Sequence, residues 1–338
     1  MKRNAHFFQI SLAISAMLLL ILDPQTAKTG ASEGIELCIR VIIPSLFPFF
    51  IVTSFLNTSL LGLRIPLLHI LSKQLQIPDG GESVLVLGLM GGYPVGAQLV
   101  CDVYAEKRLS KRDCQILLGY CSNAGPAFIF GVTGMLFKAH WVPFVLWGIH
   151  ILSALITGWL LPRPHSTAID LRGAPGASIV SALRKSIHIC ASVCGWVTIF
   201  KIILAYLNQW LRNDLRNEIM ICIAGFLELT NGCLQLEQID SEAARFILCT
   251  AFLSFGGICV LLQTASVTRE LGYGLYIPGK IMQTAVSVLI ATLLSVLLFD
   301  STPSPSTLLS TGFLCVLLLI LTRKYIEKMC GNYAKSNV

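Results

Sequence analysis

One carboxylate lies inside an apolar segment in the second half of the chain. Glu228 is the sole acidic residue in such a position there, within the sequence Gly225-Phe-Leu-Glu-Leu-Thr-Asn-Gly232. An ionisable residue at membrane depth is costly and marks a functional site by default, so we expect Glu228 to bind a cation, a proton or a polar solute. If the segment is shallow, the carboxylate is simply solvated. Lys201, in the apolar stretch 186–210, either pairs with Glu228 or extends to the membrane interface.

Polar side chains in the first half fall where glycine and proline break the apolar pattern. Residues 88–97 read Gly-Leu-Met-Gly-Gly-Tyr-Pro-Val-Gly-Ala, and residues 121–126 read Cys-Ser-Asn-Ala-Gly-Pro. Glycine and proline weaken a helix, and broken backbone at membrane depth must be shielded by protein or line a wet cavity. Tyr93, Ser122 and Asn123 can therefore hydrogen-bond a polar solute. One alternative is that these side chains only hydrogen-bond the backbone groups that the break leaves free. Another is that the glycines and prolines serve only close helix packing.

Interrupted segments recur in both halves, which is the best sequence pointer to a transport-type binding site. The second half repeats the pattern in the segment around Glu228 and again at Phe255-Gly-Gly257. We therefore predict a substrate site formed by residues of all four segments. Its members are Gly91, Gly92, Tyr93, Pro94, Ser122, Asn123, Gly125, Glu228, Thr230, Asn231, Gly256 and Gly257.

Catalytic and cofactor motifs are not apparent in the sequence. It has no nucleotide-binding P-loop, dinucleotide fingerprint, HExxH motif or nucleophile elbow. None of the twelve cysteines forms a CxxC pair, so neither a zinc site nor a disulfide framework is expected. We expect no enzyme activity, no catalytic residues, no cofactor and no metal.

The composition indicates an integral membrane protein. Of 338 residues, 54% are hydrophobic and 13% are charged, and several stretches approach the ~20 apolar residues that a spanning helix needs. The formal net charge of +7 comes from basic residues near span ends, where cytoplasmic loops carry them, so nucleic acid is not an expected partner. About eight spans are predicted, near residues 7–22, 35–60, 113–137, 141–161, 186–210, 243–267, 279–299 and 306–322.

Charge asymmetry favours two re-entrant hairpins, at 82–101 and 217–235. With both hairpins returning to the side they came from and the N-terminus cytoplasmic, eighteen of the 25 lysines and arginines, Lys280 among them, fall on the cytoplasmic side. Four fall on the far side. If residues 83–100 crossed the membrane, the basic cluster at 107–112 would move outside, against the positive-inside rule. The two halves are then inverted repeats, and both termini are cytoplasmic.

Five parts of the chain follow from this organisation. They are an N-terminal span and loop (1–34), a first repeat (35–161), a linker (162–181), a second repeat (182–299), and a C-terminal span with a basic tail (300–338). A retained first span is expected at the N-terminus, with a signal peptide as the alternative. Residues 64–79, where basic residues alternate with leucine and isoleucine, read as interfacial.

Three segments resemble a known family. Pro44-Ser-Leu-Phe-Pro-Phe-Phe50, Gly92-Tyr-Pro-Val-Gly-Ala97 and Cys121-Ser-Asn-Ala-Gly-Pro126 resemble the YlbJ family of sporulation integral membrane proteins, within the nucleoside-recognition (Gate) domain group. The likeness covers most of the chain and is strongest from about residue 37 to 137. It implies a role in forming the spore, in particular its cortex, in an endospore-forming bacterium, and it supplies no substrate.

The Gate group also includes concentrative nucleoside transporters, and the resemblance implies their architecture. Their first hairpin carries a Gly-Gln-Thr-Glu-like tip, whereas Gly92-Tyr-Pro-Val95 lacks the carboxylate. Glu228 matches the glutamate of their second hairpin, and Phe255-Gly-Gly-Ile-Cys259 resembles their Phe-Ala-Asn-Phe-Ser stretch. The expected fold is thus an all-α polytopic membrane protein with inverted Gate-like repeats and two re-entrant hairpins.

The expected function is a transporter-like carrier or channel for a small polar solute in the sporulating cell. A nucleoside-like molecule and an ion are both open as the solute. The alternative function is a non-transporting membrane scaffold or sensor for cortex assembly. The expected surroundings are the lipid bilayer of the cell membrane, with the forespore and mother-cell membranes both open, and a homo-oligomer remains an option.

Overall fold

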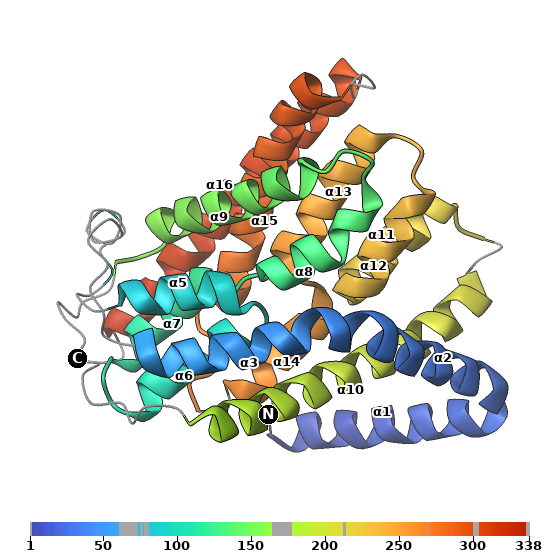
Figure 1. Ribbon diagram of the computed structural model, residues 1–338, viewed down its shortest axis with the longest axis horizontal. Coiled ribbons are helices and arrows are strands. Elements are labelled where there is room, and N and C mark those ends of the chain that lie inside the picture. Colours follow the sequence, from blue (N-terminus) through green and yellow to red (C-terminus); the bar gives the residue numbers. More distant parts are fainter. Residues whose placement is uncertain are drawn as a thin grey trace.

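The computed structural model describes residues 2–60, 74, 77, 81–163, 178–211, 214–268, 270–299 and 304–335. Throughout these residues the regular structure is helical, without strands (Figure 1). The first half contains α1 (Lys2–Leu22), α2 (Pro24–Leu37), the π-helical turn η1 (Cys38–Ile42), α3 (Ile43–Leu60), α5 (Glu82–Gly91), α6 (Val95–Ala105), α7 (Lys111–Cys121), α8 (Pro126–Gly131), η2 (Thr133–Leu136) and α9 (Val142–Leu160). The second half contains α10 (Ile179–Leu211), α11 (Asn217–Leu227), α12 (Leu229–Gln235), η3 (Leu236–Gln238), α13 (Glu242–Phe255), α14 (Gly257–Val267), α15 (Tyr276–Leu298) and α16 (Pro305–Lys335).

Six helical stretches in the described residues are long and apolar enough to cross a membrane: Pro24–Leu56, Val142–Leu160, Ile179–Leu211, Glu242–Val267, Tyr276–Leu298 and Pro305–Met329. Their outer faces are apolar, with Leu297 80%, Leu309 75% and Phe313 72% exposed. Apolar surface of this extent marks contact with a partner or a membrane, and helices of this length and composition fit lipid. The chain is therefore a multi-pass membrane protein.

The N-terminal region differs from the expected span and loop. Residues 24–34 are helical instead of a loop, because Asp23 caps α2 by accepting a hydrogen bond from Thr26 N at 3.1 Å. Helix α2 continues through η1 into α3, in which Pro48 lies inside the helix. The local cap and the glycines Gly30 and Gly34, which pack against α10, let this polar stretch continue the helix.

Residues 82–101, predicted to be a re-entrant hairpin, form two short helices that fold back on each other, and their re-entry into the membrane stays a prediction. Helices α5 and α6 pair across a turn at Gly92–Pro94, and Gly92 has a left-handed φ of 74°. A Cβ on Gly96 would lie 3.2 Å from Gly88 Cα and 2.5 Å from Cys121 O, so the two legs of this hairpin meet α7 with no space for side chains. We call α5–α6 hairpin 1.

The predicted break after Cys121 is also present. Helix α7 begins after Ser110, whose Oγ accepts a hydrogen bond from Asp113 N at 3.1 Å, as the capping pattern predicts. It ends at Cys121, residues 122–125 are non-helical, and α8 resumes at Pro126. We call residues 122–125 break 1.

The second half repeats this order of elements. Helices α11 and α12 form hairpin 2, whose legs touch where a Cβ on Gly232 would lie 2.1 Å from Gly225 Cα. Helices α13 and α14 are separated at Gly256, which has φ 82° and which we call break 2. Hairpins 1 and 2 lie on opposite sides of the molecule, at the left and the right of the view (Figure 1).

Two expectations fall outside the described residues. The structure describes only residues 74 and 77 of the interfacial segment 64–79, and only 162, 163 and 178–181 of the linker 162–181.

Candidate functional site

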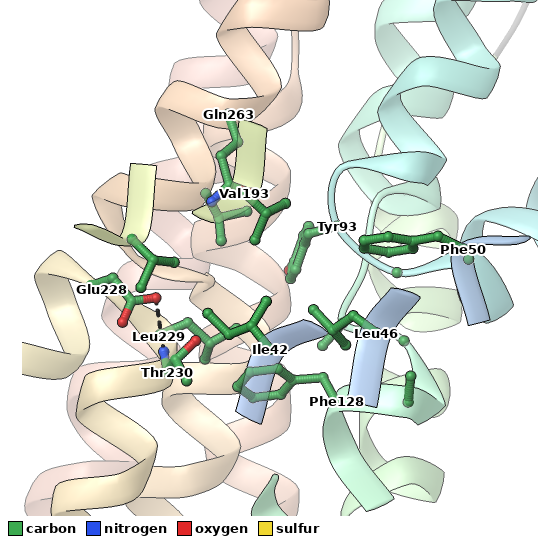
Figure 2. A pocket seen from close by; sticks show the side chains of 17 residues that line it. Ile42, Leu46, Phe50, Tyr93, Phe128, Val193, Glu228, Leu229, Thr230 and Gln263 are labelled. Carbon is green, nitrogen blue, oxygen red and sulfur yellow. Dashed lines mark hydrogen bonds between the residues drawn. The ribbon is translucent and has the colours of Figure 1, made fainter. Parts of the chain in front are cut away.

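A small cavity lies where the two halves meet. Its volume is about 40 Å³, which has room for a few water molecules. It is bounded by the turns of both hairpins, by break 1, and by apolar side chains of α3, α8, α10 and α14. Figure 2 shows the ring of Tyr93 between the side of the cavity that holds Glu228 and the side that holds Phe50. Of the four broken segments predicted to form one site, both hairpin turns and break 1 line this cavity, whereas Gly256 and Gly257 of break 2 do not.

Glu228 lies at the turn of hairpin 2 and is 1% exposed. Its two carboxylate oxygens accept three hydrogen bonds, from Thr230 N at 2.9 Å and from Asn231 N and Nδ2 at 2.7 Å each. The side chain is thus the N-cap of α12, where a negative charge is favoured by the helix dipole and by the free N–H groups. Glu228 also lines the cavity, so its carboxylate is fixed by its own helix at the edge of the site.

Lys201 does not pair with Glu228. Its Nζ lies 3.2 Å from Glu33 Oε2, a residue of the polar stretch that the sequence reading placed in a loop. Because that stretch is helical, α2 packs along α10 and presents a carboxylate to Lys201. This ion pair replaces the predicted pairing with Glu228, while extension to the membrane interface stays a prediction.

Tyr93 connects hairpin 1 to break 2. Its side chain lines the cavity, and its hydroxyl lies 3.4 Å from Leu253 O and 3.5 Å from Ser254 O. These carbonyls belong to the last turn of α13, where break 2 leaves acceptors without a helical donor. A residue of the first half therefore contacts the buried C-terminal end of a helix in the second half.

Lys280 is the charged residue beneath this junction. It is 0% exposed, and its Nζ donates to Gln283 Oε1 at 2.6 Å, to Tyr93 Oη at 3.1 Å and to Asn123 Oδ1 at 3.1 Å. A lysine ammonium has three donors, so each finds one oxygen. Within the described residues no carboxylate forms an ion pair with Lys280.

His150 on α9 links the two breaks. Its Nε2 accepts a hydrogen bond from Ala124 N at 3.0 Å, and its Nδ1 lies 3.5 Å from Ser254 Oγ. Since Nε2 is the acceptor, a neutral ring carries its proton on Nδ1 and donates toward Ser254. His150 therefore satisfies an amide that break 1 frees, and it does so inside the core at 2% exposure.

The predicted site residues separate into two groups. Half of them line the cavity: Gly91, Gly92, Tyr93, Gly125, Glu228 and Thr230. The other half do not: Pro94, Ser122, Asn123, Asn231, Gly256 and Gly257.

Several residues of the second group have other positions that explain them. Asn123 does not line the cavity, and its Oδ1 accepts a hydrogen bond from Lys280 Nζ. Asn231 lines a separate, more open cavity of about 320 Å³ together with Glu33 and Lys201. A Cβ on Gly257 would lie 3.2 Å from Leu227 O, so this glycine serves the packing of hairpin 2 against break 2.

Sequence reasoning missed Lys280 and His150. Lys280 falls among the charges predicted to be cytoplasmic, and no site role is predicted for His150, but both are buried beside the breaks. Lys280 comes five residues into α15, at a position that resembles an interfacial lysine at a span end. The neighbouring glycine, Gly279, hints at close packing, because a Cβ there would lie 2.2 Å from Gly119 O. The glycine is visible in the sequence, but the helix that packs against it, α7, is known only from the structure.

A comparison with curated proteins identifies one relative. The chain is 23% identical over 300 residues to the sporulation integral membrane protein YlbJ of Bacillus subtilis (strain 168), covering 74% of this chain and 72% of the relative. No family model matches the chain, and no solved structure matches it. The match confirms the resemblance predicted from the three motifs, while inclusion in the Gate group stays a prediction. The chain is a multi-pass integral membrane protein that is similar in sequence to YlbJ.

Proposed function

We propose that this protein is a carrier or channel for a small polar solute in a sporulation membrane, and that it serves the formation of the spore cortex. The observation that carries the proposal is the position of the cavity. Turns from both hairpins and one break meet there, and a mostly apolar lining carries four polar side chains, those of Tyr93, Glu228, Thr230 and Gln263. Sites of this composition, mostly apolar with a few placed polar groups, are typical of small-molecule binding.

The order of elements supports a transporter architecture. Each half has a hairpin, an interrupted helix and a long apolar helix in the same sequence order, and the hairpins lie on opposite sides of the molecule. We infer that the halves are inverted repeats, as in transporters whose sites lie between repeats at the membrane midplane. The sporulation role rests on the similarity to YlbJ, which is named as a sporulation protein.

The size of the cavity bears on the solute. About 40 Å³ is far below the roughly 300–1,000 Å³ of sites for drug-sized ligands. A solute larger than a few waters therefore needs the hairpin turns to separate. We infer that the structure is an occluded form, and that the open cavity beside Asn231, Glu33 and Lys201 is the approach to hairpin 2.

One observation favours the alternative scaffold function. The polar groups at the junction satisfy one another: Glu228 caps α12, Lys280 has three oxygen acceptors, and His150 holds Ala124 N. A protein that only retained the fold needs these contacts too. The scaffold function predicts that replacing Glu228 leaves spores normal, whereas the transport function predicts a defect.

Metabolite profiling separates the two functions. Spores or proteoliposomes with and without the protein are compared for small polar solutes, using wild type, Glu228→Gln, and the exposed control Glu237→Gln. We expect a solute to be depleted without the protein and with Glu228→Gln, while Glu237→Gln matches wild type. Normal spores and solutes in Glu228→Gln at wild-type protein levels would establish the scaffold function instead.

A further inference from the structure

We propose that Lys280 is a tethered cation that latches hairpin 1 to the second half of the molecule, and that loss of its proton opens the latch. The proposal rests on the proposed carrier function, since it makes the proton the ion coupled to movement of the site. The latch itself is a property of the protein without solute, so it is tested separately from transport.

The arrangement of oxygens around Lys280 Nζ is that of a cation site. Three oxygens from three separate elements surround it: Tyr93 Oη from the turn of hairpin 1, Asn123 Oδ1 from break 1, and Gln283 Oε1 from α15. The distances, 3.1 Å to Tyr93 and Asn123 and 2.6 Å to Gln283, are those of hydrogen bonds from a charged N–H donor. The ammonium therefore occupies the place that a bound ammonium-like ion would take.

The protonation state of Lys280 decides how many of the three surrounding oxygens receive a hydrogen bond. The protonated amine has three N–H groups for three oxygens. The neutral amine has two N–H groups and a lone pair, so one oxygen loses its donor and faces a lone pair instead. Tyr93 and Asn123 belong to the first half and Lys280 and Gln283 to the second, so loss of the bond to Tyr93 or to Asn123 loosens the contact between halves.

The proton has a defined route out. Tyr93 both accepts from Lys280 Nζ and lines the cavity. When water enters the cavity, the N–H bond of Lys280 breaks and an O–H bond forms, directly or through the tyrosine hydroxyl. The products are a neutral amine and a hydronium ion, which exchanges with bulk water on the side to which the cavity is open.

Other titratable groups face Lys280, and titration of one of them, His150, would change the latch in the opposite direction of pH. These groups are Tyr93 on hairpin 1, Cys121 at the end of α7, His150 on α9 and Tyr276 on α15. From the described residues of α13 and α16, the remaining helices packed on α15, no charged group forms an ion pair with Lys280. Protonation of His150 would remove the acceptor of Ala124 N on acidification. Opening on acidification would thus indicate His150, whereas opening on raising the pH indicates Lys280.

Hydrogen exchange measured by mass spectrometry tests the latch in the purified full-length protein. Exchange of peptides covering 91–95 and 122–125 is divided by the intrinsic rate at each pH, in wild type, Lys280→Met and the control Lys201→Met. In wild type and Lys201→Met we expect corrected exchange in both segments to rise roughly tenfold as the pH increases, as loss of a hydrogen bond to a charged group implies. In Lys280→Met the corrected exchange of both segments should be high at every pH. Residues 228–231, held by Glu228, should not respond.

Three results would overturn the latch: pH-independent exchange in wild type, an unchanged pH response in Lys280→Met, or opening on acidification. If Lys280→Met does not accumulate, Tyr93→Phe removes the oxygen of hairpin 1 and keeps the lysine, and its corrected exchange at 91–95 should start higher than in wild type. Unchanged exchange in Tyr93→Phe would also overturn the latch. Transport that fails while the latch responds would instead count against the proposed carrier function.

Chemical rescue gives a second readout. In Lys280→Ala, propylammonium should restore slow exchange at 122–125, because it supplies the missing donors in the space of the deleted side chain. Tetramethylammonium, which has no N–H donor, should not. Equal effects of the two ions would show that the oxygens around Nζ do not select a hydrogen-bonding cation.

Discussion

Hairpin 1 and hairpin 2 have the same order of elements, but different contacts hold their turns. The turn of hairpin 2 is stabilised locally, because Glu228 caps the helix that follows it through hydrogen bonds two and three residues away. The turn of hairpin 1 is held from a distance, because Tyr93 contacts Lys280, which is 187 residues away. A local cap keeps one turn intact whatever the other half does. A distant contact makes the other turn depend on how the halves are packed.

The largest expected effect comes from the glycines that bring the hairpin legs together. A Cβ on Gly232 would lie 2.1 Å from Gly225 Cα, and one on Gly88 would lie 2.1 Å from Cys121 O. Because backbone cannot yield as a side chain can, Gly232→Ala and Gly88→Ala should each lower the unfolding free energy by about 3 kcal/mol or more. Thermal unfolding in detergent measures this.

The matched control is Gly195→Ala, in α10, where a Cβ meets nothing within 4 Å. It should be neutral or slightly stabilising, since alanine is favoured over glycine in a helix by roughly 0.5–1 kcal/mol. If Gly88→Ala and Gly195→Ala unfold at the same temperature, the close approach of hairpin 1 to α7 is wrong.

The next effect concerns the distant contact. A double-mutant cycle of Tyr93→Phe with Lys280→Met should give a coupling energy of about 1.5–3 kcal/mol, the value for a hydrogen bond to a charged group. The cycle of Tyr93→Phe with Glu228→Gln should give about zero, within the ~0.5 kcal/mol additivity of independent sites. Coupling of similar size in both cycles would mean that the two turns are not held independently.

A smaller effect is expected at the local cap. Glu228→Gln keeps the shape of the side chain but removes the charge at the start of α12 and one of the acceptor oxygens. The unfolding free energy should fall by about 1 kcal/mol, as for loss of an N-cap. Hydrogen exchange should increase at Thr230 and Asn231 and stay unchanged at Tyr93. Spread of the increase to hairpin 1 would contradict a purely local cap.

The sequence predicts the features that depend on local contacts and misses those that depend on distant contacts. The hairpins, both breaks and the Ser110 cap depend on neighbouring residues, and glycine, proline and capping patterns report them. The helical conformation of residues 24–34 was missed because a polar composition suggests a loop, whereas packing of Gly30 and Gly34 against α10 stabilises the helix. Lys280 was misplaced for the related reason that its three acceptors include two from the other half.

At the candidate site, too, the sequence predicts local breaks in the helices but not which side chains face the cavity. Glycine and proline breaks predicted which backbone segments would converge, and six of the predicted residues do line the cavity. The side of each turn that faces the cavity depends on the crossing of helices, so Asn123 and Asn231 were assigned to the wrong surroundings. Apolar lining residues from α3 and α10 carry no sequence signal that separates them from lipid-facing positions.

The most direct test of the account is whether the two hairpins enter from opposite sides of the membrane. Single cysteines replace Lys107 or Lys111, beyond hairpin 1, and Arg216, before hairpin 2; all three are exposed. The background is Cys222→Ser, since Cys222 is the exposed cysteine among those described. Labelling by a membrane-impermeant maleimide is read by peptide mass in intact cells and in inverted vesicles. The account predicts that Lys107→Cys and Lys111→Cys react only from the cytoplasm and Arg216→Cys only from outside. Reaction of all three from the same side would contradict it.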